Sequence, residues 1–147
     1  MRIVVQEQPF DLGAETTTFA AGHKEMGAIV TFTGIVRDLP YDPLRAMEIE
    51  HYAGMTEAAL TEIAQTAIDR WALGDALIIH RHGRLAPGEL IMMVATASKH
   101  RKDAFEAAEY LMDHLKSRAP FWKREIADTG EHWVASKADD EDALTRW

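Results

Sequence analysis

The chain has 147 residues, of which 47% are apolar and 27% charged, and its formal net charge at pH 7 is -8. This size and composition predict a single globular domain over residues 1–147 and exclude a disordered or fibrous protein. The negative charge argues against nucleic-acid binding, and no apolar run approaches the roughly 20 residues of a membrane span. The first residues lack the pattern of a signal peptide, so we expect a cytoplasmic protein that does not bind membranes.

The sequence contains no cysteine. Disulfides, zinc–thiolate sites, iron–sulfur clusters and thiolate nucleophiles are therefore excluded. If the chain handles sulfur, the sulfur must arrive on another molecule. His80 and His82 are two residues apart and therefore share one face of a predicted strand, as a pair of metal ligands would. No third ligand accompanies them, so we expect neither a metal nor a cofactor.

Apolar periodicity and turn residues predict alternating strands and helices. The expected elements, in chain order, are a strand at 2–5, a weak helix at 11–21, a strand at 27–37, a loop at 38–43, a strand at 44–52, a helix at 54–71, a strand at 76–85, a turn at 86–89, a strand at 90–97, a helix at 99–118, a short strand around Trp133 and a C-terminal helix at 139–146. We expect the strands at 76–85 and 90–97 to form a hairpin. The predicted fold class is α+β with a largely antiparallel sheet and packed helices.

The basic residues are concentrated in one segment. Residues 99–124 carry seven Lys or Arg residues against four Asp or Glu residues, whereas the rest of the chain is acidic. A basic segment in an acidic protein indicates a small anion site, although scattered surface charge would look the same. The aromatic and basic residues at 119–124 are typical of a segment that binds a flat heterocycle with an acidic group. They are equally typical of a segment that anchors in the core and leaves its basic end in solvent. We interpret Trp71, Trp133 and Trp147 as packing residues.

The first turn of the helix at 99–118 breaks two rules of helix chemistry, because cations are disfavoured at a helix N-terminus and Arg rarely faces a core unpaired. A helical projection places Arg101 near the centre of the apolar stripe and His100 at its edge, with Ser98 as the expected N-cap. A bound anion at this helix end would explain both exceptions. An ion pair between Arg101 and a neighbouring carboxylate is the alternative, but we favour the anion, because departures from local rules tend to mark functional sites.

Lys116 lies at the other end of the same stripe. A lysine that borders apolar surface can act as a base or nucleophile, but a lysine in the last helical turn also stabilises the helix dipole. His100 and Lys116 are about 24 Å apart along the helix, too far for one small substrate. Either they serve different sites, or a two-fold dimer brings the opposite helix ends together.

Several segments resemble the large subunit of molybdopterin synthase. They are GAIVTFTGIVR (27–37), IEHYAGMTE (49–57), IHRHGRLAPGE (79–89), ASKHRKDAFEA (97–107), YLMDHLKSRAPFWKRE (110–125) and the terminal Arg146-Trp147. The resemblance runs in order over nearly the whole chain, and the segment around KSRAPFWKRE is highly specific. It implies an α/β hammerhead-type α+β fold.

The resemblance also implies an activity. The protein would be a sulfurtransferase that converts cyclic pyranopterin monophosphate to molybdopterin by inserting two sulfur atoms. The donor would be the C-terminal thiocarboxylate of a small ubiquitin-like subunit, and two large subunits would dimerise within a heterotetramer. By position, the resemblance marks Lys116 and Lys123 as catalytic. The implied substrate-binding residues are Arg37, His100, Arg101, Lys116, Lys123, Arg124 and Glu125.

Two other functions remain open at this point. One is a non-enzymatic module that binds the extended C-terminal tail of a partner protein. The other is a hydrolase of a phosphate ligand, which would consume a pterin substrate without any donor protein.

Overall fold

The computed structural model of the chain describes residues 1–135 and 137–147 and contains two four-stranded sheets. The first sheet has the strand order β1 (Arg2–Gln6), β4 (Asp75–Arg81), β6 (Leu90–Ser98), β2 (Ala28–Ile35). The second has the order β5 (Gly83–Leu85), β3 (Leu44–His51), β7 (Phe121–Ala127), β8 (Gly130–Trp133). The helices are α1 (Leu12–Ala20), α2 (Met55–Trp71), α3 (Arg101–Ser117), α4 (Ala138–Ala143) and the 3-10 turn η1 (Leu144–Arg146).

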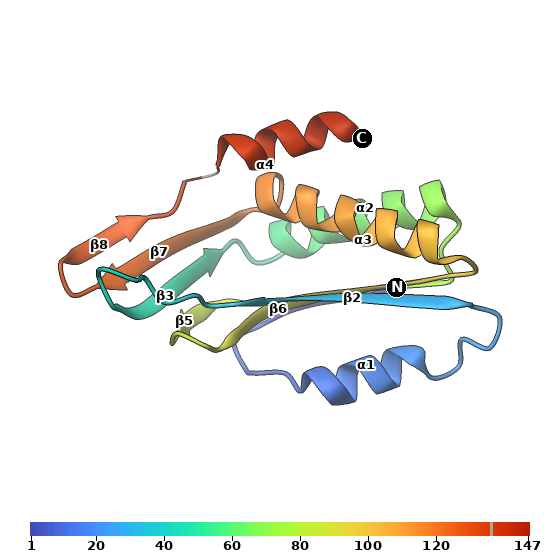
Figure 1. Cartoon of the computed structure of the whole chain (residues 1–147), viewed down its shortest axis with the longest axis horizontal. Helices are drawn as coiled ribbons and strands as arrows, with labels where there is room; N and C mark the ends of the chain where they lie inside the picture. Colours follow the sequence, from blue (N-terminus) through green and yellow to red (C-terminus); the bar gives the residue numbers. More distant parts are fainter. Residues whose placement is uncertain (136) are drawn as a thin grey trace.

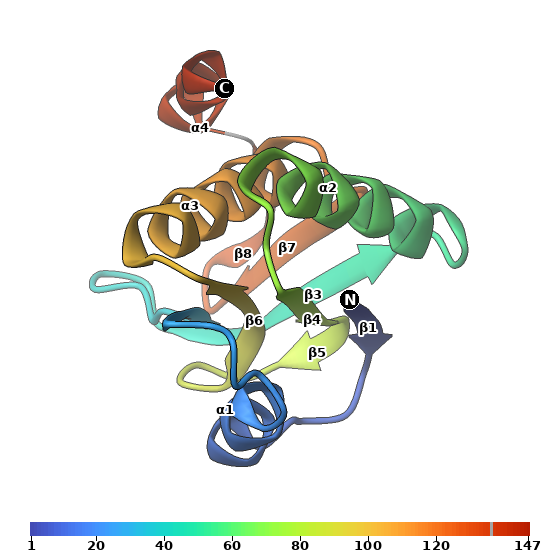
Figure 2. The same cartoon turned by 90° about the vertical axis from the view of Figure 1, so that its right-hand side faces the viewer.

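Only β1 and β4 pair in parallel, and every other pair of strands in the described part of the chain is antiparallel. The expected α+β class with a largely antiparallel sheet is confirmed. Helices α2 and α3 lie side by side on one face of the first sheet, and α1 covers the other face (Figures 1 and 2). The second sheet projects beyond the first, and α4 packs outside α3.

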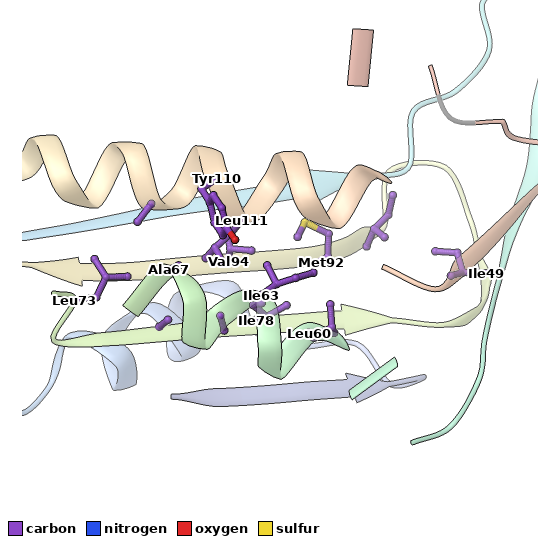
Figure 3. Close-up of a cluster of buried hydrophobic side chains, with 14 of the residues drawn as sticks. Ile49, Leu60, Ile63, Ala67, Leu73, Ile78, Met92, Val94, Tyr110 and Leu111 are labelled. Carbon is purple, nitrogen blue, oxygen red and sulfur yellow. The ribbon is translucent and has the colours of Figure 1, made fainter. Parts of the chain in front are cut away.

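The core lies between the first sheet and the helix pair (Figure 3). Leu60 of α2, Ile78 of β4 and Leu111 of α3 are all fully buried there. β4 and β6 are buried along almost their entire length, because helices cover both faces of this sheet. No helix of the described residues is both long and apolar enough to cross a membrane.

The prediction of one continuous strand at 76–85 was wrong. The chain leaves the first sheet after Arg81, and Gly83 has φ +92°, a conformation that L side chains rarely adopt. The following β5 pairs with β3 of the second sheet, so this break passes the chain from one sheet to the other. The predicted antiparallel pairing of these strands is confirmed only for β4 and β6, with Asp75 opposite Ala97 and His80 opposite Met92, whereas residues 83–85 pair with β3 instead.

The sequence reading missed β7. Its residues alternate without a uniformly apolar face, since Phe121 and Lys123 point to one side while Trp122 and Arg124 point to the other. The strand forms because it pairs along its whole length with β3, which lies far earlier in the chain, from His51 opposite Phe121 to Leu44 opposite Ala127. The strand expected around Trp133 and the C-terminal helix are confirmed as β8 and as α4 with η1.

Leu111 provides a test of the core. Truncation to alanine removes apolar contacts and leaves a cavity between α3 and the sheet, so Leu111→Ala should lower the free energy of unfolding by about 2–5 kcal/mol. Met55→Ala, at an exposed position of α2, is the control and should change it by less than about 0.5 kcal/mol. Urea denaturation measures both, and equal losses would contradict this placement of the core.

Candidate active site

A cavity of about 320 Å³ opens where the end of α3 meets both sheets. Its walls come from the end of β2, the end of β4, the start of β6, the last turns of α3 and β7. The residues that line it are Phe32, Thr33, Gly34, Ile35, His80, Ile91, Met92, Met112, Leu115, Lys116 and Lys123. The lining is mainly apolar with a few convergent polar groups, which is typical of a small-molecule site.

Two lysines reach this cavity from different elements. Lys116 lies in the last turn of α3, and Lys123 is the third residue of β7, opposite Ile49 of β3. Arg118 ends the helix and Pro120 follows, so the chain turns directly into β7 and returns beside the helix end. The short connection therefore places two positive charges at one cavity wall.

The two lysines differ in burial. Lys116 is exposed, whereas Lys123 is half-buried, so the apolar surroundings expected for Lys116 belong mainly to Lys123. Burial, reinforced by the positive charge of Lys116, lowers the pKa of Lys123 to about 8, while the carboxylate of Asp140 acts in the opposite direction. Lys123 is therefore mostly charged at neutral pH but can release its proton at little cost.

A second, smaller cavity of about 120 Å³ adjoins the first. Leu115, Lys116 and Lys123 line both cavities, so they form the boundary between them. The remaining wall of the smaller cavity comes from Ala119, Phe121, Val134, Ala135, Lys137 and Asp140. The C-terminal segment thus contributes to the site, which the sequence did not indicate.

His80 lines the larger cavity, although the sequence marks it only as one of two histidines on a predicted strand face without a third metal ligand. In the structure the two histidines have different neighbours. His80 is buried and its ring stacks on Phe121, whereas the ring of His82 contacts His51, with ring centroids 4.3 Å apart. Among the described residues, no group of three or more His, Cys, Asp or Glu side chains is placed to hold a metal ion.

The structure places three of the predicted anion-binding residues away from this cavity. Arg37 is exposed just beyond β2, and His100 and Arg101 are exposed at the N-terminal end of α3. The expectation that Arg101 faces the core was wrong, and the N-cap is His100 rather than Ser98. Within one chain, Arg101 and Lys116 lie at opposite ends of the same helix.

The face of α3 that packs on the core is rotated relative to the predicted stripe. Ala104, Ala107 and Leu111 are buried, whereas Phe105 is 61% exposed. Phe105 instead lines an open, mainly apolar hollow of about 550 Å³ beside β2, whose other lining residues are Val30, Thr31, Phe32, Ala108, Glu109, Met112 and Asp113.

Arg124 and Glu125 line neither of the two cavities at the lysines. Arg124 lies on the opposite face of β7 from Lys123, forms ion pairs with Glu48 and Glu131, and lies over the ring of Trp133. Trp133 is 58% exposed, so its prediction as a packing residue was wrong.

The packing interpretation of Trp71 and Trp147 is confirmed. The ring of Trp71 contacts those of Tyr110 and Trp147, and the indole of Trp147 donates to Asp113 at 2.7 Å.

The fold and the cavity define an α+β protein with a small, mainly apolar cavity that two lysines line. The MoaE protein family model matches residues 5–118. A molybdopterin synthase catalytic subunit of Cereibacter sphaeroides is 64% identical over 147 residues, which is the full length of both chains. A solved molybdopterin biosynthesis MoaE protein of Burkholderia ambifaria superimposes with a TM-score of 0.85 at 49% identity, covering 99% of this chain and 97% of that one.

A more distant structure, a complex of subunits 1 and 2 of molybdopterin-converting factor from Helicobacter pylori, has a TM-score of 0.77 at 20% identity. It covers 92% of this chain and 91% of that one, and at this identity the likeness concerns the fold alone. The chain belongs to the MoaE family. The family resemblance in the sequence is thereby confirmed, and the expectation of an enzyme subunit agrees with the description of the Cereibacter relative.

The pKa of Lys123 tests the electrostatics of the site. Removal of the neighbouring charge in Lys116→Ala relieves repulsion of the Lys123 ammonium group, so the pKa of Lys123 should rise from about 8 towards its ordinary 10.5, by about one pH unit. Competitive amine labelling as a function of pH, read by peptide mass spectrometry, measures this pKa.

Lys24→Ala is the matched control, because Lys24 is exposed, lies outside α3 and lines neither of the two cavities. It should leave the pKa of Lys123 unchanged. If the two variants shifted the pKa equally, Lys116 would not be the relevant neighbour.

Proposed function

We propose that this chain is the catalytic subunit of a molybdopterin synthase. It would convert cyclic pyranopterin monophosphate to molybdopterin with sulfur from the C-terminal thiocarboxylate of a small ubiquitin-like subunit. The observation that carries the proposal is the pair of lysines at the boundary between two adjoining cavities. Membership of the MoaE family supports the same reaction class.

The two cavities fit the two reactants. The larger, mainly apolar cavity suits the flat pterin ring, and the smaller suits the extended tail of the donor subunit. Their common wall contains Lys116 and Lys123, so both lysines would lie where sulfur and pterin side chain meet. The chain has no cysteine, which is consistent with sulfur delivered by a partner.

In this proposal the thiocarboxylate sulfur attacks a carbon of the pterin side chain, so that a C–S bond forms while a C–O bond at that carbon breaks and its oxygen leaves with a proton. Water then hydrolyses the resulting thioester, which leaves the sulfur on the pterin and releases the donor tail as a carboxylate. The sequence occurs twice, each time with a fresh thiocarboxylate. Lys116 orients the anionic tail and transfers protons, and the ammonium group of Lys123 stabilises negative charge that develops during the attack. The pKa of Lys123, about 8, also suits proton transfer near neutral pH.

The substrate phosphate would be held by Arg37, His100 and Arg101. Since His100 and Lys116 are separated by the length of α3, about 24 Å, one subunit cannot apply both to one small substrate. A second copy of the chain would supply the missing end of the helix, so each site would be composite.

The exposed edge of the first sheet supports such a dimer. β2 is one of the two edge strands of this sheet, and its Phe32 and Ile35 are 45% and 56% exposed. Phe105 lines the adjoining hollow. Exposed apolar side chains on an edge strand are typical of an interface. Phe32 and Met112 line both this hollow and the cavity of about 320 Å³ that the two lysines share. A second copy packed against the hollow would therefore border the site.

A small-subunit partner is supported by the Helicobacter pylori structure, which is a complex of two subunits of molybdopterin-converting factor. We therefore propose a heterotetramer of two large and two small subunits. The proposed location of the complex is the cytoplasm.

The central experiment removes the amine at position 116. With thiocarboxylated small subunit and cyclic pyranopterin monophosphate, Lys116→Ala should reduce dithiolene formation by at least about a hundredfold, because proton transfer and charge placement are both lost. Single-turnover formation of the dithiolene, followed by chromatography of its oxidised derivative, measures the rate. Lys24→Ala, at an exposed lysine outside α3 that lines neither of the two cavities, is the matched control and should retain wild-type turnover.

Three outcomes would contradict parts of the proposal. Near-normal turnover of Lys116→Ala would remove Lys116 from the mechanism. Consumption of the pterin without donor protein would indicate a hydrolase, and tail binding by the wild-type chain without pterin conversion would indicate a binding module.

A subunit-mixing experiment tests the composite site. When Lys116→Ala and Arg101→Ala subunits are mixed in equal amounts, half of the dimers contain one of each. Each such mixed dimer has one intact site if the two residues act in trans. The mixture should therefore recover roughly a quarter of wild-type activity, while each parent remains nearly inactive. Recovery no greater than that of the parents would reject the composite site.

A further inference from the structure

His80 is a polar group of the larger cavity to which the proposed reaction assigns no role. The polar side chains that line this cavity are Thr33, His80, Lys116 and Lys123. Charged lysines only donate hydrogen bonds, so a bound ring that carries N–H groups needs an acceptor elsewhere in the wall. His80 comes from β4, a central strand between β1 and β6, and is 4% exposed.

The hydrogen bonding of His80 determines which ring nitrogen is the acceptor. Nδ1 lies 2.8 Å from the carbonyl oxygen of Arg81. A carbonyl can only accept, so Nδ1 carries the proton and Nε2 keeps a free lone pair. No described residue forms a hydrogen bond with Nε2.

The ring is also held in orientation. It stacks on Phe121 with centroids 3.7 Å apart and planes inclined by 16°. Phe121 and Lys123 point to the same side of β7, so the stack links the imidazole to the strand that carries the buried lysine.

The surroundings of His80 keep it neutral. Burial lowers the pKa of His80 to about 3, and the positive charges of Lys123 and Lys116 contribute in the same direction. The hydrogen bond to the Arg81 carbonyl opposes this shift but does not outweigh it. The lone pair on Nε2 is therefore present throughout the physiological pH range.

We propose that His80 is a specificity-determining residue whose Nε2 accepts a hydrogen bond from an N–H group of the heterocycle bound in the larger cavity. This contact selects rings that present a donor and orients the ring so that its side chain points to Lys116 and Lys123. The inference rests on the proposed function, because it takes the ligand to be a pterin.

Two substitutions separate hydrogen bonding from packing. His80→Phe keeps a flat ring against Phe121 but has no acceptor, whereas His80→Gln loses the ring and keeps an acceptor oxygen. With cyclic pyranopterin monophosphate, His80→Phe should raise the KM about tenfold with a smaller change in kcat, and His80→Gln should stay within about threefold of wild type. The reverse order would show that His80 acts by packing alone and would overturn the inference.

A spectroscopic measurement on the wild-type protein does not depend on the folding of any variant. In the full chain with 15N-labelled histidine, Nδ1 of His80 should be protonated and Nε2 unprotonated between about pH 6 and 8. Saturation with cyclic pyranopterin monophosphate should shift the Nε2 resonance in the direction expected for an accepted hydrogen bond. A protonated Nε2 in the free protein, or an Nε2 resonance unchanged by the pterin, would overturn the inference.

These measurements distinguish failure of the inference from failure of the proposed function. If wild-type protein forms no dithiolene with thiocarboxylated partner, the sulfurtransferase proposal fails, and the pterin-induced shift of Nε2 still decides the role of His80. If dithiolene forms normally and KM is the same in His80→Phe as in wild type, only the role of His80 is rejected.

Discussion

The constraint on which the site depends is the placement of two ammonium groups at one wall of a small, mainly apolar cavity. Like charges repel, and burial of one of them adds a desolvation cost, so this arrangement opposes folding unless other interactions hold it. The turn from α3 into β7 imposes it, because the helix ends at Ser117 and the strand that carries Lys123 starts at Phe121. An anionic ligand would relieve the repulsion, which connects the stability of the site to its function.

The passage of the chain between two sheets builds the rest of the cavity. At Gly83 the backbone leaves β4 and enters the second sheet, so the end of β4 faces β7 across the junction. His80 and Phe121 stack at that place, one from each sheet. The same contact therefore contributes to packing between the sheets and fixes a neutral imidazole in the cavity wall beside two cations.

Amphipathic helix patterns and the hairpin were predictable because they depend on neighbours close in sequence. The helix at 54–71 and the pairing of β4 with β6 follow from local apolar spacing and turn residues. The break at Gly83 and strand β7 were not predictable in this way. β7 is stabilised by β3, and its own sequence reads as an irregular mixture of aromatic and basic residues.

The chemical composition of the site is readable in the amino-acid sequence: no thiol, a basic segment at 99–124, and a motif that carries Lys116 and Lys123 and indicates the MoaE family. Three features emerge in the folded chain alone: Lys123 is the more buried lysine, Arg101 is exposed rather than turned to the core, and His80 lines the cavity. They are not readable in the sequence because burial, pKa and side-chain direction depend on which surfaces of distant elements meet, and periodicity along one helix or strand does not specify its rotation against the others.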